Sequence, residues 1–318
     1  MAKQFLSQKN QTSDNNSAAS VKLQAGQVIA HFGKHLIIED SKGQQHRCVS
    51  RRNLPPLVCG DHIKWHYPDP KSCVISELEE RSSLLARPDP RGQQKIIAAN
   101  IDQILIINSP IPAFNEGLLD RYLVAAEHTG IHPVIVMNKS DLIDKTQQQE
   151  YQERLSIYTN IGYEVIYTSI IDTAAFHQLS EKLTGKTSIL VGQSGVGKSS
   201  ILNHLLPDIN ARVGELSEAT GKGQHTTTTA RLYRLPDNGS LIDSPGIREF
   251  GLWKITPDQL SKGFIEFGDY ENSCRFRNCM HHNEPGCAVI DATRNKAIST
   301  ERYQSYLRIL DSLINEEN

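Results

Sequence analysis

The sequence lacks any run of the roughly eighteen consecutive apolar residues that a membrane-spanning helix needs. It also lacks an apolar stretch after the first charged residues of the N-terminus, which excludes the pattern of a secretory signal. We therefore expect a soluble, unexported protein that makes no membrane contact and resides in the cytoplasm.

An excess of charge of one sign is also absent, since 34 Lys and Arg residues stand against 36 Asp and Glu residues. The composition as a whole therefore does not indicate nucleic-acid binding. Any basic surface must be local, such as Arg275 and Arg277 or the group of Arg47, Arg51 and Arg52. A solvated charged face explains these arginines nearly as well as contacts with a phosphate backbone do.

A chain of 318 residues is too long to fold around one ordinary hydrophobic core, so we expect two or three domains. Residues 1–20 are rich in Gln, Asn and Ser, and we expect a disordered tail. Residues 21–88 contain five short strand-like runs between Gly, Pro and Asp residues, which predicts an OB-type β-barrel. The segment from Arg87 to Lys95 holds two prolines and a glycine among charges, and we expect it to break regular structure at a domain boundary.

Residues 89–253 alternate apolar strand-like runs with helix-like stretches, which predicts an α/β domain with a parallel sheet and helices on both faces. In residues 254–318 the strand-like runs stop, and a helical domain with a Cys/His cluster is expected. Its last helix should be amphipathic, with one apolar face formed by Tyr303, Tyr306, Leu307, Leu310, Leu313 and Ile314.

A phosphate-binding loop is predicted where a strand-like run meets a helix-like one. The sequence matches the pattern G-x-x-x-x-G-K-[ST] in the strand–loop–helix context that this pattern requires. The matching residues are Gly192, Gln193, Ser194, Gly195, Val196, Gly197, Lys198 and Ser199, and Ser200 follows them. Glycines let successive backbone N–H groups point at phosphate oxygens. We expect Lys198 to neutralise the β and γ phosphates and Ser199 to ligate Mg²⁺. The alternative, a Gly-rich turn without function, does not account for the flanking elements.

A guanine-reading motif is predicted at Asn138, Lys139, Ser140 and Asp141, which follow an apolar strand-like run. The Asp141 carboxylate can accept from two adjacent guanine donors that adenine lacks, so it would select guanine. Ser169, after the run EVIY, belongs to the same expected site. Alone, the four-residue motif could be a polar turn, and the phosphate-binding loop in the same predicted sheet is what favours the functional interpretation.

Two further segments complete the expected nucleotide site. Asp243 ends a strand-like run, and Gly246 lies three residues later. Asp243 can hold Mg²⁺ through water, and Gly246 can contact the γ-phosphate. A β-turn is the alternative for this segment. Between the loop and Asp243 lies a threonine run in which Thr227 and Thr228 are candidate Mg²⁺ ligands, and the sequence does not decide between them.

The order of these motifs is unusual, because the guanine-reading segment precedes the phosphate-binding loop. Ordinary GTPases have the reverse order. A circular permutation keeps the same spatial site while the chain is cut elsewhere. We therefore expect a circularly permuted P-loop GTPase domain.

A metal site is predicted in the C-terminal region, where four potential ligands lie within fourteen residues: Cys274, Cys279, His281 and Cys287. Three thiolates and one imidazole suit a closed tetrahedral Zn²⁺ site of the structural kind. His282 is an alternative ligand, and a chance cluster of reduced cysteines is the alternative to a metal. We expect the remaining cysteines, Cys48, Cys59 and Cys73, to pack as small apolar side chains without chemistry.

Together these residues resemble the bacterial RsgA (YjeQ) family of circularly permuted GTPases, which act late in assembly of the small ribosomal subunit. The resemblance runs from about Gly26 to the C-terminus. It rests on AANID, NKSD, GQSGVGKSS, GQHTTT, DSPGIREFGLW and the Cys-Cys-His-Cys spacing.

The resemblance implies an N-terminal OB-fold, a GTPase domain and a zinc domain, with both flanking domains contacting ribosomal RNA. It also implies slow hydrolysis of GTP to GDP that the small subunit stimulates and that releases the protein or other assembly factors. Ile247 stands where many GTPases have a water-orienting Gln, and His225 is the family's candidate substitute. We expect a monomer.

Two other readings compete with a GTPase. In the first, the barrel and the zinc domain bind RNA while GTP only orders the switch loops, and hydrolysis is too slow to matter. In the second, the protein is an ATP-dependent RNA factor and the NKSD segment is accidental. Nucleotide turnover with and without ribosomal subunits separates the first from a GTPase, and nucleotide preference separates the second.

Overall fold

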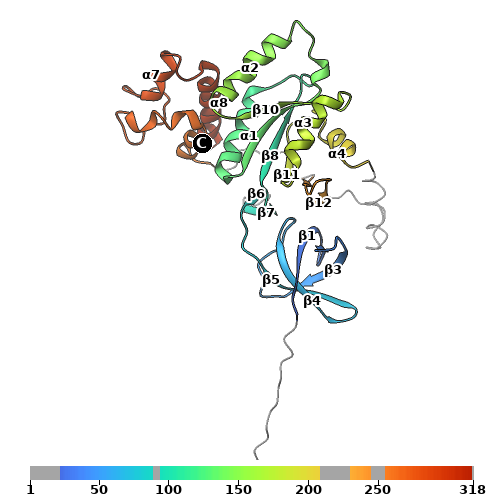
Figure 1. Ribbon diagram of the computed structural model, residues 1–318. Coiled ribbons are helices and arrows are strands. Elements are labelled where there is room, and N and C mark those ends of the chain that lie inside the picture. The colour runs from blue at the N-terminus through green and yellow to red at the C-terminus, as the bar shows by residue number, and fades with distance from the viewer. Residues whose placement is uncertain (1–21, 89–93, 208–229, 245–254, 317–318) are drawn as a thin grey trace, which may run out of the picture.

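The computed structural model describes residues 22–88, 94–207, 230–244 and 255–316. Three parts follow one another along the chain: a small barrel, a central sheet with helices, and a helical C-terminal domain that lies beside α1 and α2 (Figure 1). No helix in these ranges is long and apolar enough to cross a membrane.

The N-terminal part is a closed barrel of the strands β1 (Gln24–Phe32), β2 (His35–Asp40), β3 (Gln45–Ser50), β4 (His62–Asp69) and β5 (Ser72–Leu78). The ring closes because β1 pairs with both β2 and β4, while β3 pairs in parallel with β5. Alternate residues point inward and build a core around Trp65, which is 1% exposed. The predicted OB-type barrel is confirmed.

Two of the barrel cysteines behave differently from the prediction. Cys48 and Cys73 are buried in the barrel core, as expected, but they face each other on the paired strands β3 and β5 and form a disulfide. The expectation that they only pack was therefore wrong, because nothing in the sequence shows which strands become neighbours. Cys59 is a buried free thiol.

The two ends of the segment expected to break regular structure belong to a pair of strands. Strand β6 (Leu84–Pro88) pairs with β7 (Gln94–Ala99), and Arg87 lies opposite Lys95. A two-stranded sheet accepts Pro88 because the proline stands at the end of an edge strand, where no ladder donor is required. Strand β6 ends at Pro88 and β7 begins at Gln94, and residues 89–93, at the centre of the predicted break, lie outside the described residues.

The central sheet contains β8 (Gln103–Asn108), β9 (His132–Met137), β10 (Glu164–Tyr167), β11 (Thr187–Val191), β12 (Arg231–Arg234) and β13 (Ser240–Asp243). Five strands are parallel in the order β10-β9-β8-β11-β13, and β12 pairs antiparallel with β13. At the far edge β12 pairs with barrel strand β1, where Ala30 lies opposite Arg231.

Helices cover both faces of this sheet, as predicted. They are α1 (Glu116–Thr129), α2 (Gln148–Asn160), α3 (Thr173–Leu183) and α4 (Lys198–Leu205), with a short 3-10 turn η1 (Ser140–Leu142). The apolar strand β8 serves both faces: Ile104 and Ile106 pack in the core under α1 and α2, whereas Leu105 and Ile107 pack in the core under α3 and α4.

The C-terminal domain contains α6 (Pro257–Lys262), η3 (Ile265–Phe267), η4 (Glu271–Ser273), α7 (Ala288–Arg294) and α8 (Thr300–Glu316). A capping box between Thr256 and Gln259 begins α6. The predicted amphipathic face of α8 is confirmed, because Tyr306, Leu310 and Leu313 are buried in the core of this domain. Helix α8 also packs against α1 of the central domain.

Candidate functional site

The predicted nucleotide motifs lie at one edge of the sheet, at the carboxyl ends of the parallel strands. Asn138 follows β9, Ser169 follows β10, Gly192 follows β11, and Asp243 ends β13. After β10 the chain crosses over β9 and β8 to continue at β11, which makes the boundary between β8 and β11 a point where the strand order reverses. Open α/β sheets bind ligands in the crevice outside such a point.

The phosphate-binding loop connects β11 to α4 and approaches its neighbours closely. Gly192 has φ +139°, and a Cβ there would lie 2.3 Å from the carbonyl oxygen of Ile107. Gly197 has φ +99°, and a Cβ there would lie 2.3 Å from the Asn138 amide nitrogen. Both positions therefore require glycine, for backbone conformation and for space. Val196 is buried, while Gln193, Ser194 and Gly195 are exposed at the tip of the loop.

Lys198 begins α4 and its ammonium group lies over the loop, where it donates to the carbonyl oxygens of Gly192 and Gln193 at 2.6 Å each. The charge is therefore held beside the backbone that would surround a phosphate group. Ser199 and Ser200 follow in the exposed first turn of the helix. Their hydroxyls stand at the helix N-terminus, where the backbone N–H groups favour anions.

The guanine-reading motif is bonded directly to the phosphate-binding loop. The Asn138 amide donates to the carbonyl oxygen of Val196 at 2.8 Å, and the Lys139 ammonium donates to those of Gly195 and Ile111 at 2.7 Å each. Lys139 has φ +56°, the left-handed conformation that turns the chain sharply into η1. Two motifs that are more than fifty residues apart in the chain therefore form one structure.

Asp141 is exposed, and its carboxylate accepts a hydrogen bond from the hydroxyl of Ser169. This contact orients the acidic group and joins the loop after β9 to the loop after β10. The backbone repeats the connection, because the Ser140 N–H donates to the Thr168 carbonyl oxygen at 3.1 Å. All four residues of the motif, together with Ser169, are thus brought to the same place.

Two further residues, Ile111 and Thr168, contribute to this site. The carbonyl oxygen of Ile111 holds Lys139, and only the fold reveals that contact. Thr168 is fully buried and stands between β10 and Ser169. Its hydroxyl and the Asn138 side-chain oxygen are buried without a hydrogen-bond partner among the described residues. Its position at a strand end would have indicated Thr168.

Of the five other residues predicted for the nucleotide site, one lies among the described residues and four do not. Asp243 is exposed at the end of β13, on the strand next to β11. His225, Thr227, Thr228 and Gly246 lie outside the described residues.

The predicted metal ligands converge in the C-terminal domain. One donor atom from each of Cys274, Cys279, His281 and Cys287 lies within 4.8 Å of all the others. The His281 Nδ1 atom is 3.6 Å from the Cys274 sulfur and 3.3 Å from the Cys287 sulfur, and these two sulfurs are 3.9 Å apart. This cluster can hold a metal ion. Its two half-buried and two buried ligands leave little access for solvent.

The backbone around the cluster is fixed by groups that do not contact a metal. The Glu284 carboxylate accepts from three backbone N–H groups, those of residues 280 (2.8 Å), 282 (2.9 Å) and 283 (3.1 Å). From α8, Tyr303 donates to the His281 carbonyl oxygen at 2.8 Å and Tyr306 to that of Met280 at 2.6 Å. Burial raises the pKa of Cys279 to about 12, so a cation would be needed to hold that thiolate.

Known proteins are similar to this chain in sequence and in fold. The sequence model of the RsgA GTPase family matches residues 78–253. The small ribosomal subunit biogenesis GTPase RsgA of Ectopseudomonas mendocina is 50% identical over 294 residues, covering 91% of this chain and 86% of the relative. RsgA of Pseudomonas aeruginosa is 49% identical over 290 residues, with the same coverage.

Among solved structures, YjeQ from Thermotoga maritima has a TM-score of 0.77 and 31% identity, covering 92% of this chain and 99% of that protein. YloQ, described as a circularly permuted GTPase, has a TM-score of 0.75 and 27% identity, covering 93% and 96%. The similarity spans all three parts of the fold and includes the family match over the nucleotide motifs. This chain therefore belongs to the RsgA GTPase family.

Proposed function

We propose that this protein binds and hydrolyses GTP and acts in biogenesis of the small ribosomal subunit. The observation that supports the proposal is the bonding of Asn138 and Lys139 to the backbone of the loop after β11, because this bonding would hold the proposed guanine-reading and phosphate-binding segments in one frame. The relatives that are about half identical over most of the chain carry the name of that activity and that process.

Transfer of a phosphoryl group to water needs positioning and charge stabilisation more than covalent chemistry. Lys198 and the N–H groups of residues 192–198 would hold the β and γ phosphates. Ser199 and Asp243 would hold Mg²⁺, which would supply positive charge against the negative charge that develops on the phosphates. Thr227, Thr228 and Gly246 remain proposed partners of the ion and of the γ-phosphate, and His225 remains the proposed residue that positions water.

We propose zinc as the ion of the Cys/His cluster. Tetrahedral bonds of zinc to sulfur at about 2.3 Å and to nitrogen at about 2.0 Å require sulfurs about 3.8 Å apart and sulfur–nitrogen distances of about 3.5 Å. The cluster has 3.9 Å for one sulfur pair, and 3.3 and 3.6 Å from His281 Nδ1 to two sulfurs. With four protein ligands and no open position, the ion would be structural and would stabilise a domain with few regular elements.

The proposed roles of the domains follow the predicted division of the chain. We assign residues 21–88 to an RNA-binding barrel, 89–253 to the GTPase domain and 254–318 to the zinc domain, with residues 1–20 as a tail. The small subunit and its rRNA would be the macromolecular partner, with other assembly factors beside it. The protein would act as a monomer in the cytoplasm.

Nucleotide selectivity tests the proposal through Asp141. The Asp141→Asn variant loses a carboxylate acceptor and gains an amide donor, so it should bind GDP at least a hundredfold more weakly and bind xanthosine diphosphate more tightly than the wild type does. Fluorescent-nucleotide titration measures both affinities. An unchanged preference for GDP over XDP in the variant would show that Asp141 does not read the base.

A further inference from the structure

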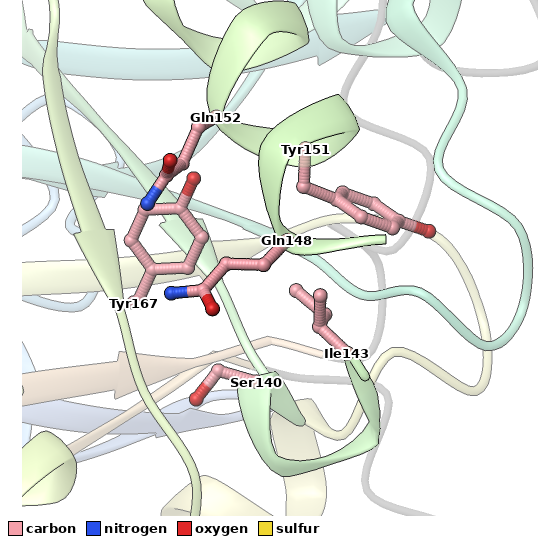
Figure 2. Close-up of a pocket in the computed structure, with 6 residues that line it drawn as sticks. All are labelled: Ser140, Ile143, Gln148, Tyr151, Gln152 and Tyr167. Atoms are coloured by element: carbon pink, nitrogen blue, oxygen red, sulfur yellow. The ribbon is translucent and has the colours of Figure 1, made fainter. Parts of the chain in front are cut away.

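A cavity of about 260 Å³ lies beside the guanine-reading motif, and its lining includes Ser140 of that motif. It is lined from three elements: η1 and the residue after it, the first turns of α2, and the last residue of β10. Figure 2 shows its lining, which is Ser140, Ile143, Gln148, Tyr151, Gln152 and Tyr167.

The lining combines aromatic and apolar walls with neutral polar groups. Tyr167 forms one side, and the amide groups of Gln148 and Gln152 extend from α2 toward its ring (Figure 2). Among the residues that the structure describes, no charged side chain lines the cavity. Within the part of the chain that the structure describes, no hydrogen bond uses the Ser140 hydroxyl or either amide. The polar part of this lining is larger than the apolar part, and converging polar groups beside an aromatic wall can fix the orientation of a small molecule.

This chemistry selects a planar, uncharged ring that has donors and acceptors on its edge. The absence of lysine and arginine from the lining disfavours phosphate and carboxylate groups. A glutamine amide offers donors and an acceptor side by side, which matches the N6–H and N7 atoms of adenine, and a tyrosine ring provides a stacking surface. The volume is below the roughly 300–1,000 Å³ of sites for drug-sized ligands, and suits one base rather than a whole nucleotide.

We propose that this cavity is a second binding site, which takes an uncharged nucleobase, adenine in the first instance. The base would come either from a free nucleoside or from an unpaired base of RNA. Tyr167 would stack on the ring, and Gln148 and Gln152 would pair with its edge.

The cavity also borders both segments of the proposed guanine site, through Ser140 and Tyr167. The coupling that we propose between the two sites rests on the proposed function. Ser140 stands between Lys139, which is bonded to the phosphate-binding loop, and Asp141, which is bonded to Ser169. Tyr167 is two residues before Ser169. A base bound in the cavity therefore contacts residues next to the guanine-reading groups. Bound base should change the affinity for GDP, and bound GDP should change the affinity for the base by the same factor.

Equilibrium dialysis of labelled adenosine against the full chain, saturated with GDP and Mg²⁺, tests the proposal. We expect one adenosine per chain, and binding at least fivefold weaker in Tyr167→Leu, the loss expected from one base–aromatic contact. Gln152→Ala changes an exposed side chain and should weaken binding similarly without affecting folding. Gln149→Ala is the matched control, because Gln149 lies on the same helix, bonds to Glu153, and does not line the cavity.

Competition identifies the source of the base. A short oligoadenylate that displaces adenosine at lower concentration than adenosine itself would assign the site to RNA, and equal or weaker displacement would assign it to a free nucleoside. Absence of binding of both probes, or equal binding by Gln152→Ala and wild type, would overturn the site. If adenosine changes the dissociation constant of GDP less than twofold, the coupling is overturned but the site is not. If the protein fails to bind GDP, the proposed function is contradicted instead.

Discussion

Replacing Arg302 by methionine should detach the C-terminal domain from the GTPase domain. The guanidinium group is 1% exposed and donates to Asp120 of α1 at 2.5 Å. It also donates to both carboxylate oxygens of Glu266, at 2.8 and 3.0 Å, and lies 4.3 Å from the ring centre of Phe264. One cation from α8 thus compensates two carboxylates, and one of these belongs to the neighbouring domain.

The size of the effect follows from what Arg302→Met leaves behind. Methionine keeps the apolar volume but removes the charge, so Asp120 and Glu266 remain buried without their cation. Removing one partner of a buried ion pair typically destabilises by about 3–5 kcal/mol. Two carboxylates are left here without a cation, although Asp120 keeps a hydrogen bond from Tyr158 at 2.9 Å, so we expect the upper part of that range.

The destabilisation should depend on pH in a defined direction. Burial raises the pKa of Asp120 above its ordinary value, and Arg302 opposes that effect. Loss of Arg302 raises the pKa of Asp120 further. A group whose pKa is raised by folding stabilises the folded state at low pH and loses that contribution as the pH rises through the folded-state pKa. The variant should therefore lose more stability at pH 8 than at pH 5.

Guanidinium chloride unfolding followed by far-UV circular dichroism measures both effects. In Arg302→Met the C-terminal domain should unfold in a separate, earlier transition. Arg294→Met is the matched control, because Arg294 pairs only at the surface with Asp291, and it should change stability by less than about 1 kcal/mol. Adding Asp120→Asn and Glu266→Gln to the variant should restore part of the loss. A loss under 1 kcal/mol, or one that is equal at pH 5 and pH 8, would refute this reasoning.

The other predictions concern the metal cluster and the nucleotide site. Cys287→Ser should reduce the metal content, measured by elemental analysis, from one ion per chain to near zero, and chelation of the wild type should lower its unfolding temperature as much as the substitution does. Asn138→Ala leaves the buried carbonyl oxygen of Val196 without its donor and should weaken GDP binding about tenfold or more in a fluorescence titration. Gly192→Ala places a Cβ against the carbonyl oxygen of Ile107 and should abolish nucleotide binding while lowering the unfolding temperature.

Much of this fold could be predicted because its signals are local. The strand β8 is apolar at consecutive positions, which is typical of a strand covered on both faces. The phosphate-binding loop carries its own geometry in Gly192 and Gly197. The Cys/His spacing likewise depends on one short segment, and its four side chains do converge.

What the sequence could not show depends on contacts between distant segments. The β6–β7 hairpin is defined by pairing across the predicted boundary, as between Arg87 and Lys95. The local signal of helix α2 is weak, because its polar sequence buries only Tyr151, Leu155 and Tyr158. The partners of Arg302 are 36 and 182 residues away along the chain, so no local pattern indicates the buried network.

Phosphate release tests the central claim most directly. The protein should be incubated with GTP or ATP at equal concentration and with Mg²⁺, alone, with purified small ribosomal subunits, and with large subunits. We predict release from GTP only, slow for the protein alone and strongly increased by small subunits but not by large ones. Equal turnover of ATP, or GTP turnover that stays negligible when small subunits are present, would contradict the account.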